Sequence, residues 1–292
     1  MDWLFFTEVT LAGLGAGGLF ALTGIAFVLI YKATHVVNLA IGEILMLGAY
    51  VFLGFAAGLA LPTPLALLLT LICAGASGWV IERTMIRPML GESPISVFML
   101  TIGLGSILVG LVELGWGPAP VRLPEFLPNS ALFIGEAYLS AKIATAFAAA
   151  AVVVAIFVVL FRYWRGGVAL RATAADPAAA YSVGINVPGV FSLAWVIGCV
   201  IAAGAGVLVG AIGGLSTTMG VFGLTVLVVV IVGGLDSVLG AMVAGVMIGL
   251  LEAWTGAYLG GEYKQVVTFS LLVVVLMIRP YGLFGSHEIE RL

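Results

Sequence analysis

One carboxylate stands inside a stretch of this 292-residue chain that is apolar enough to cross a membrane. Glu43 follows Asn38 and Gly42 in the second such stretch. An ionisable group at membrane depth is costly and by default marks a functional site. An amide and a glycine beside it suit an interrupted helix, whose freed backbone groups need side-chain partners. Two interpretations stay open: these residues stabilise a helix break or contact, or they touch a transported solute.

The other polar residues form no pattern for catalysis or metal binding. An intramembrane enzyme needs a nucleophile with a base, paired carboxylates or a cluster of metal ligands, and no such spacing occurs in the apolar stretches. The histidines, His35 and His287, are far apart in the sequence, and Cys73 and Cys199 lie in apolar runs. We therefore expect no metal site and no disulfide.

Three further carboxylates lie at the ends of apolar runs and are interpreted as anchors that reach interfacial water: Glu82, Glu113 and Glu252. The chain has no Gly-Lys dipeptide, and therefore no Walker A loop that could hold a nucleotide. We expect that it binds no cofactor and is not an enzyme, and that any ATP with its Mg²⁺ is used by a partner subunit.

The polar segment 162–187 carries helix signals of its own. Asp176 can cap a helix, Pro177 suits the first helical position and Gly184 suits its end. The residues between, 178–183, are small and mildly apolar, which favours insertion into a groove on another protein. An ordinary helix at the membrane interface is the alternative.

The elements that position these residues are membrane-spanning helices. Hydrophobic residues make up 63% of the chain and charged residues 9%, with a mean hydropathy of +1.27, whereas soluble domains carry about 25% charged residues. A spanning helix needs about 20 apolar residues. The pattern predicts an all-α, polytopic bundle that forms one domain over residues 1–292. Its predicted spans are 9–31, 36–58, 62–81, 95–115, 143–161, 188–214, 221–235, 238–254 and 266–278. The number of spans is expected to be eight, nine or ten.

The seventh and eighth spans are predicted to be a short, re-entrant or broken pair, because Gly233, Gly234, Leu235, Asp236 and Ser237 join them. Glycines four residues apart predict close helix packing, with a hinge or a place on the substrate path as the alternative. They are Gly13 and Gly17, Gly54 and Gly58, Gly206, Gly210 and Gly214, and Gly245 and Gly249.

Basic residues orient the spans. With the N-terminus outside and retained, eight basic residues lie in inner connections: Lys32, Arg83, Arg87, Arg162, Arg165, Arg171, Arg279 and Arg291. Three lie outside: Arg122, Lys142 and Lys264. This asymmetry follows the positive-inside rule. It predicts that 162–187 and the C-terminus are cytoplasmic and that the proline-rich stretch 116–142 is extracytoplasmic.

Four motifs, in order along the chain, resemble one known family. The first comprises 17–22, 29–32, 38–43 and 47–50, and the second is 101–104, which begins with Thr101. The third comprises Arg171, Ala172, Asp176, Ala179, Ala180, Gly184 and Ile185, and the fourth comprises Gly233, Gly234, Ser237, Gly240, Ala241, Glu252 and 279–285. Together they resemble the permease subunits of ABC importers for branched-chain amino acids, the hydrophobic amino acid uptake family.

Two departures from that family leave the solute open. Ile41 stands where the family usually has histidine, and Leu235-Asp236 replaces the more usual small pair before Ser237. Related permeases serve branched-chain and other amino acids, urea, short amides and aromatic acids.

The resemblance implies a subunit of the bacterial or archaeal cytoplasmic membrane. Its partners would be a second, related permease, two cytoplasmic ABC ATPases and an extracytoplasmic solute-binding protein, with no nucleic acid. Asn38, Gly42, Glu43 and Thr101 would line the translocation pathway, and Gly233, Gly234 and Ser237 would form a hinge or turn. The residues that would couple to the ATPase are Arg171, Ala172, Asp176, Ala179, Tyr181 and Gly184.

Two other functions are weighed against this one. A stand-alone secondary transporter would use Glu43 as its coupling group and the stretch 38–42 as a broken-helix site. A membrane enzyme acting on lipid is disfavoured by the missing catalytic clusters.

Overall fold

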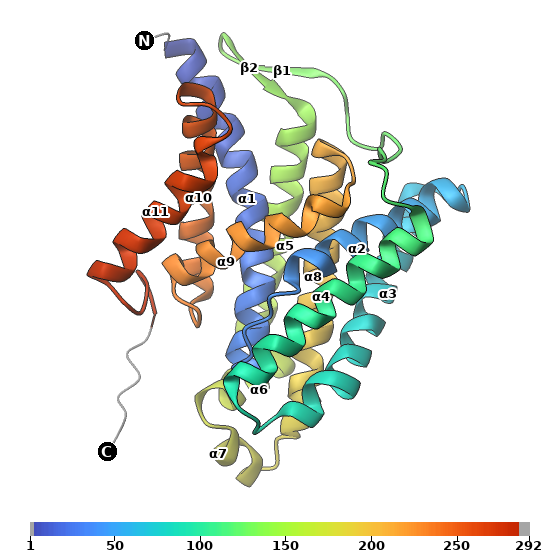
Figure 1. Cartoon of the computed structure of the whole chain (residues 1–292), viewed down its shortest axis with the longest axis vertical. Helices are drawn as coiled ribbons and strands as arrows, with labels where there is room; N and C mark the ends of the chain where they lie inside the picture. The colour runs from blue at the N-terminus through green and yellow to red at the C-terminus, as the bar shows by residue number, and fades with distance from the viewer. Residues whose placement is uncertain (1–2, 286–292) are drawn as a thin grey trace.

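Between residues 3 and 285, the part of the chain that the computed structural model describes, helices follow one another with a small β-hairpin between two of them (Figure 1). The α-helices are α1 (Trp3–Thr34), α2 (Ile41–Leu53), α3 (Thr63–Ile81), α4 (Pro94–Trp116), α5 (Ala141–Tyr163), α6 (Arg165–Ala175), α7 (Pro177–Ser182), α8 (Val187–Gly213), α9 (Val221–Gly233), α10 (Val238–Tyr258) and α11 (Tyr263–Ile278). Short π or 3-10 turns adjoin three of them: η1 (Gly54–Gly58), η2 (Glu82–Ile86), η3 (Arg87–Met89) and η4 (Thr217–Gly220). The strands β1 (Ala131–Ile134) and β2 (Ala137–Ser140) pair antiparallel, with Ala131 opposite Ser140.

Within the described residues, seven helical segments are long and apolar enough to cross a membrane. They are Trp3–Thr34, Ile41–Gly58, Thr63–Met89, Pro94–Trp116, Ala141–Tyr163, Val187–Gly213 and Val238–Tyr258. Two further apolar helices are shorter, Thr217–Gly233 and Tyr263–Ile278. Each predicted span corresponds to one of these segments, so the prediction of an all-α polytopic membrane protein is confirmed.

Two predicted spans are wrong in length. The sequence predicts a second span from residue 36, but residues 35–40 are not helical and α2 begins at Ile41. It also predicts a short eighth span over 238–254, but α10 has 21 residues and continues through Thr255 and Gly256, which interrupt the apolar run, to Tyr258. The short helices are instead α9, with 13 residues, and α11, with 16.

Glycines hold α1 against α10, the most extensive helix contact in the bundle. A Cβ on Gly17 would lie 3.1 Å from the carbonyl oxygen of Gly245, and Gly13 and Gly249 face each other in the same way. Backbones can approach this closely only where side chains are missing, so the predicted packing role is confirmed here. Nothing lies within 4 Å of a Cβ at Gly58, so the same spacing has no such role there.

Helix α8 forms the centre of the remaining bundle, because α2 and α3 both pack on it. Trp195 of α8 is fully buried. A Cβ on Gly78 of α3 would lie 2.9 Å from Sγ of Cys199, and Gly206 of α8 meets the backbone of Leu45 in α2. These contacts make α2, α3 and α8 one packed unit.

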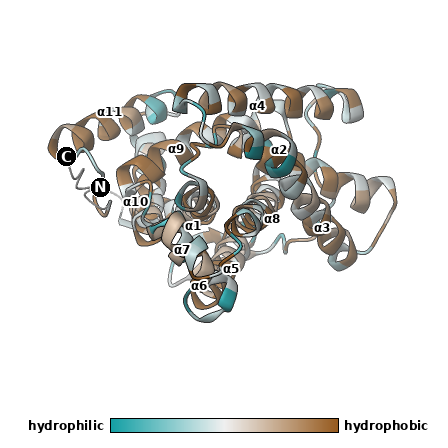
Figure 2. Cartoon of the chain, turned by 90° about the horizontal axis from the view of Figure 1, so that it is seen from below, coloured by the Kyte–Doolittle hydropathy of each residue, from teal (hydrophilic) through white to brown (hydrophobic). Residues whose placement is uncertain are grey.

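The two ends of the bundle differ. Figure 1 places the N-terminal part of α1 and the β-hairpin at one end, and α6 and α7 at the opposite end. Figure 2, viewed from the α7 end, shows α11, α9, α2 and α4 along one side, α1 and α8 in the middle, and α5 and α6 on the opposite side. The segment 162–187 holds two helices rather than the one predicted. Helix α6 is not expected from the sequence, because Gly166 and Gly167 lie near its start and glycine disfavours helices. Its Leu170 and Thr173 are buried against the bundle.

Candidate translocation and coupling sites

The break between α1 and α2 runs through the inside of the bundle. His35 takes a positive φ of 54° directly after α1. Asn38 is fully buried, and its Oδ1 accepts a hydrogen bond from the Ala40 N–H at 3.1 Å. The buried Thr101 hydroxyl of α4 accepts from the Leu39 N–H at 3.3 Å. Asn38 and Thr101, which are 63 positions apart in the sequence, thus replace helix hydrogen bonds that the break removes.

Glu43 lies in the first turn of α2, and its carboxyl group is packed between two glycines. A Cβ on Gly105 of α4 would lie 3.3 Å from its Cδ, and a Cβ on Gly220 of η4 would lie 2.8 Å from its Oε1. Glu43 Oε2 and Asn38 Nδ2 are both buried and have no hydrogen-bond partner within residues 3–285. Buried polar groups are normally paired, so these are two of the five buried side-chain atoms among the described residues that stay without a hydrogen-bond partner.

Gly42 explains how α2 approaches α9. A Cβ on Gly42 would lie 2.9 Å from both N and Cα of Gly223, and it would also collide with the carbonyl oxygen of Gly220. The structure therefore brings together the four predicted pathway candidates, Asn38, Gly42, Glu43 and Thr101. Three glycines that were not predicted lie with them: Gly105, Gly220 and Gly223. Gly220, directly before the short α9, and Gly223, in its first turn, were the signal that the sequence offered.

Helix α7 forms as its end signals predict. Asp176 Oδ1 accepts hydrogen bonds from the N–H groups of Ala178 at 2.8 Å and Ala179 at 3.0 Å, as a capping residue does. Gly184, with a φ of +86°, donates its N–H to the carbonyl oxygen of Tyr181 at 3.0 Å. Such a positive φ suits glycine at a helix end. The predicted separate helix is confirmed.

The outer surface of α7 is apolar and exposed. Only Ala180 of this helix is buried, whereas the side chain of Tyr181 is 72% exposed and that of Val183, just beyond the helix, 76% exposed. Ala179 is also exposed. This six-residue helix therefore presents small and aromatic apolar groups at the tip of the bundle.

Arg171 and Ala172, two other predicted coupling residues, lie on α6 rather than on α7. The Arg171 guanidinium donates to the carbonyl oxygens of Phe161 and, at 3.1 Å, Arg162, and it lies over the Phe161 ring. Ala172 is half-buried. Arg171 thus ties α6 to the end of α5, and it supports α7 indirectly.

The turn after α9 is bound to the C-terminal segment. Ser237 Oγ accepts from the Gly240 N–H at 3.0 Å and caps α10. The N–H groups of Leu283 and Phe284 donate to the carbonyl oxygens of Val232 at 2.8 Å and Gly233 at 3.0 Å. Two parts of the fourth motif that are about fifty residues apart in the sequence therefore form one unit at this turn. Gly234, with a φ of +110°, allows the close approach.

One carboxylate does not lie where the sequence indicates. Glu82, interpreted as an anchor in interfacial water, is fully buried and paired with Arg87. Glu113 is exposed, and Glu252 is half-buried and accepts from Thr268 Oγ1 at 3.3 Å. The interpretation was wrong for Glu82 because a wide helical turn folds Arg87 back over it.

Residues 9–276 match the protein family described as branched-chain amino acid transport system, permease component. The chain is 34% identical to the high-affinity branched-chain amino acid transport system permease protein LivH of Escherichia coli strain K12, with 99% of each chain covered. It is 31% identical to the corresponding permease protein BraD of Pseudomonas aeruginosa, with 96% of this chain and 95% of the relative covered. The chain thus belongs to this permease family and is a multi-pass membrane protein.

A solved structure supports the fold. PsaBC from Streptococcus pneumoniae in complex with Fab aligns with a TM-score of 0.52 at 12% identity, covering 94% of this chain and 92% of the other. At that identity the likeness concerns the fold alone.

Proposed function

We propose that this chain is the membrane permease subunit of an ATP-driven importer for branched-chain or other hydrophobic amino acids. The observation that carries the proposal is the match along the whole chain to relatives named as branched-chain amino acid permeases. The buried environment of Asn38 and Glu43 agrees with it, because a zwitterionic solute needs few polar partners within an otherwise apolar path. A stand-alone secondary carrier is not favoured, since these relatives are parts of transport systems.

The partners follow from the same membership. A second, related permease would complete the membrane part, two ABC ATPases would bind and hydrolyse ATP with Mg²⁺, and a solute-binding protein would deliver the amino acid. This chain lacks a Walker A loop and holds no cofactor in the proposal. The basic residues orient it in the cytoplasmic membrane with α6 and α7 in the cytoplasm and the β-hairpin outside.

Helix α7 is the part of the chain that receives the ATPase. Its exposed Ala179 and Tyr181 fit a groove on another protein. Closure of the ATPase pair on ATP would displace α7, and only four residues separate Ser182 at its end from Val187 at the start of α8. The displacement therefore reaches α8 directly, and through its contacts it reaches α2, which carries Glu43.

The pathway is assigned to the start of α2. Asn38, Gly42, Glu43 and Thr101 lie together where a helix is interrupted inside the bundle, the arrangement that transporters use for solute contacts. Gly233, Gly234 and Ser237 form a turn that the C-terminal segment supports.

Uptake of a panel of labelled amino acids, urea and short amides by cells with and without this subunit tests the proposal. We expect uptake of leucine, isoleucine or valine to depend on the subunit, and we expect an excess of unlabelled leucine to compete. Dependence confined to urea or amides would overturn the assigned solute, and loss of no solute would overturn the transport function itself.

A further inference from the structure

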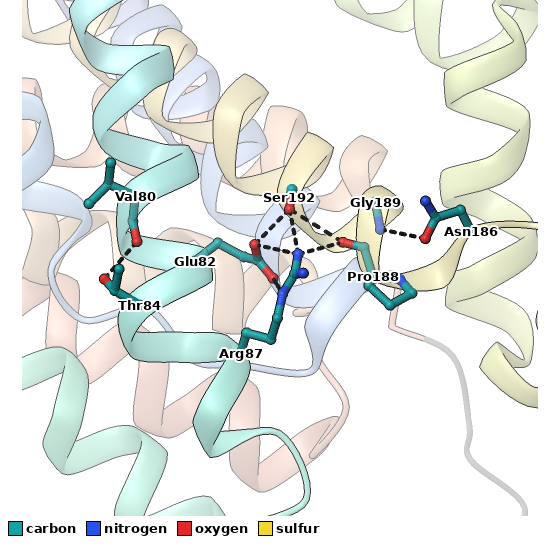
Figure 3. A network of polar contacts seen from close by, with 8 residues as sticks. All are labelled: Val80, Glu82, Thr84, Arg87, Asn186, Pro188, Gly189 and Ser192. Atoms are coloured by element: carbon teal, nitrogen blue, oxygen red, sulfur yellow. Dashed lines mark hydrogen bonds and ion pairs between the residues drawn. The ribbon is translucent and has the colours of Figure 1, made fainter.

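The segment that follows α3 holds an ion pair between the buried Glu82 and the partly exposed Arg87, and both residues hydrogen-bond to the start of α8 (Figure 3). Glu82 has no exposed surface, and it receives Arg87 in two parallel hydrogen bonds, Nε to Oε1 at 3.0 Å and Nη2 to Oε2 at 2.9 Å. Ser192 of α8 donates its hydroxyl to Oε2 of the same carboxylate at 2.6 Å. Three hydrogen bonds thus compensate the burial of this charge.

Arg87 also reaches α8 itself. Its Nη2 donates to Ser192 Oγ at 2.7 Å and to the carbonyl oxygen of Pro188 at 3.1 Å. Pro188 and Ser192 belong to the first turns of α8, as Figure 3 shows. We call Glu82, Arg87 and Ser192 the clamp, because they join two helices that are about a hundred residues apart in the sequence.

The local backbone is built for this pair. Residues five apart do not share a face of an α-helix, but η2 is a π-turn in which the Arg87 N–H donates to the carbonyl oxygen of Glu82. The wider turn places Arg87 directly over Glu82. Pro88 follows in the second position of η3 and cannot continue the helical hydrogen bonding. Such π-turns are rare and often mark functional positions.

The clamp lies next to the helix that receives the ATPase in the proposed function. Ile185 donates its N–H to the carbonyl oxygen of Ala180 at 3.1 Å and closes α7. Asn186 Oδ1 then accepts from the Gly189 N–H at 3.2 Å and caps α8. Hydrogen bonds thus close the end of α7 and cap the start of α8, and the four residues between the two helices leave little free chain to absorb a displacement.

We propose that Arg87 and Glu82 are positioning residues that lock α3 to the first turns of α8, so that a displacement of α7 moves α2, α3 and α8 as one body. The proposal rests on the proposed function, in which α7 receives the ATPase. Without the clamp, α8 would turn against α3 at this end, and part of the ATPase motion would be lost before it reached α2.

The chemistry of the pair argues for orientation rather than stability. A buried ion pair often adds no more stability than well-packed apolar residues would. A guanidinium that meets a carboxylate through two parallel hydrogen bonds fixes both distance and angle, which lysine cannot do. The side chain of Arg87 remains 30% exposed, which gives the charge access to water at the end of the bundle.

The test uses the whole importer in proteoliposomes and measures three quantities: amino acid transported per ATP hydrolysed, the ATP hydrolysis rate and the melting temperature. Arg87→Lys keeps the charge and removes the paired geometry. We expect it to assemble, melt close to the wild type and hydrolyse ATP, while the amount transported per ATP falls at least about fivefold, the lower end of ordinary coupling effects. An unchanged ratio would overturn the clamp.

Two further variants keep the result interpretable. Ser192→Ala removes one hydroxyl and leaves the ion pair in place, and we expect a smaller fall in transport per ATP. If Arg87→Lys does not fold, an unchanged ratio in Ser192→Ala overturns the proposal. Lys142→Ala breaks the exposed pair with Glu125 at the opposite end and serves as the control, with no expected change in the ratio.

The same assay separates failure of the clamp from failure of the proposed function. Ala179→Glu should prevent productive ATPase binding. If it does so while Arg87→Lys keeps a normal ratio, the clamp alone is refuted. If Ala179→Glu leaves assembly and transport per ATP unchanged, α7 is not the docking helix and the clamp falls with it.

Discussion

The α1–α2 break and helix α7 both interrupt the apolar helices of this chain. Among the described residues, the break leaves polar atoms without a hydrogen-bond partner, whereas α7 leaves apolar side chains uncovered. At the break, the backbone is hydrogen-bonded through Asn38 and Thr101, but Asn38 Nδ2 and Glu43 Oε2 have no polar partner within the described chain. At α7, the polar groups of both helix ends are paired, but Tyr181 and Val183 expose apolar surface.

The difference indicates what each region binds. Leaving a buried polar atom unpaired costs about 1–3 kcal/mol, so a small polar solute that pairs with Asn38 and Glu43, as in the proposed function, would recover part of that cost. Apolar side chains at the tip of a rigid, capped helix call for a protein groove. In the proposed function these two regions are separate, and α8 connects them, because it contacts both α2 and α7.

Placing a charge on α7 should produce the largest effect. Ala179→Glu puts a carboxylate on the exposed side of α7, where a docked ATPase would bury it without a partner. We expect uptake to fall at least about tenfold, since an unpaired charge in an interface costs 2–5 kcal/mol, while membrane insertion and melting temperature stay normal. The measurement is uptake per amount of inserted protein.

Ala131→Glu is the matched control, because Ala131 is exposed on β1 at the opposite end of the bundle. An equal loss of uptake in both variants, or normal uptake in Ala179→Glu, would mean that α7 has no docking role. The contrast between the break and α7 would then not hold.

Gly42→Ala should have an intermediate effect, a loss of stability at the break between α1 and α2. The added methyl group would meet the backbone of Gly223 and Gly220, and overpacking of this kind costs about 1–3 kcal/mol. Unfolding by SDS in mixed micelles measures the loss. Gly103→Ala on α4 is the control, since nothing lies within 4 Å of a Cβ there; equal stability of the two variants would contradict the close contact of α2 with α9.

Glu43→Gln should have the smallest effect. It keeps the shape of the side chain between Gly105 and Gly220 and removes its charge. We expect transport to fall about two- to fivefold, within the range of a single hydrogen bond, with the order of preference among amino acids unchanged. Competition by a panel of unlabelled amino acids measures that order, and a reversed order would mean that Glu43 contacts the variable side chain of the solute and selects among amino acids.

Local signals in the sequence were sufficient for α7. Asp176, Pro177 and Gly184 act within a few residues of themselves, so their types alone indicate where the helix begins and ends. The membrane spans were equally accessible, because length and hydropathy decide them.

The remaining site features depend on contacts between distant residues. Thr101 reaches the break from another helix, and Gly220 and Gly223 matter only because α9 crosses the start of α2. Arg87 could not be paired with Glu82 from the sequence, since their spacing fits a π-turn and not an α-helix. The length of α10 was underestimated because Thr255 and Gly256 interrupt the apolar run after Trp254, although the helix continues through them to Tyr258.

The energy source tests the central claim most directly. The purified chain is reconstituted alone or together with its second permease, the two ATPases and the solute-binding protein, and uptake of labelled leucine is measured with ATP or with an ion gradient. We predict uptake only in the complete, ATP-supplied vesicles, with inhibition by vanadate. Uptake by this chain alone, driven by an ion gradient, would contradict the account.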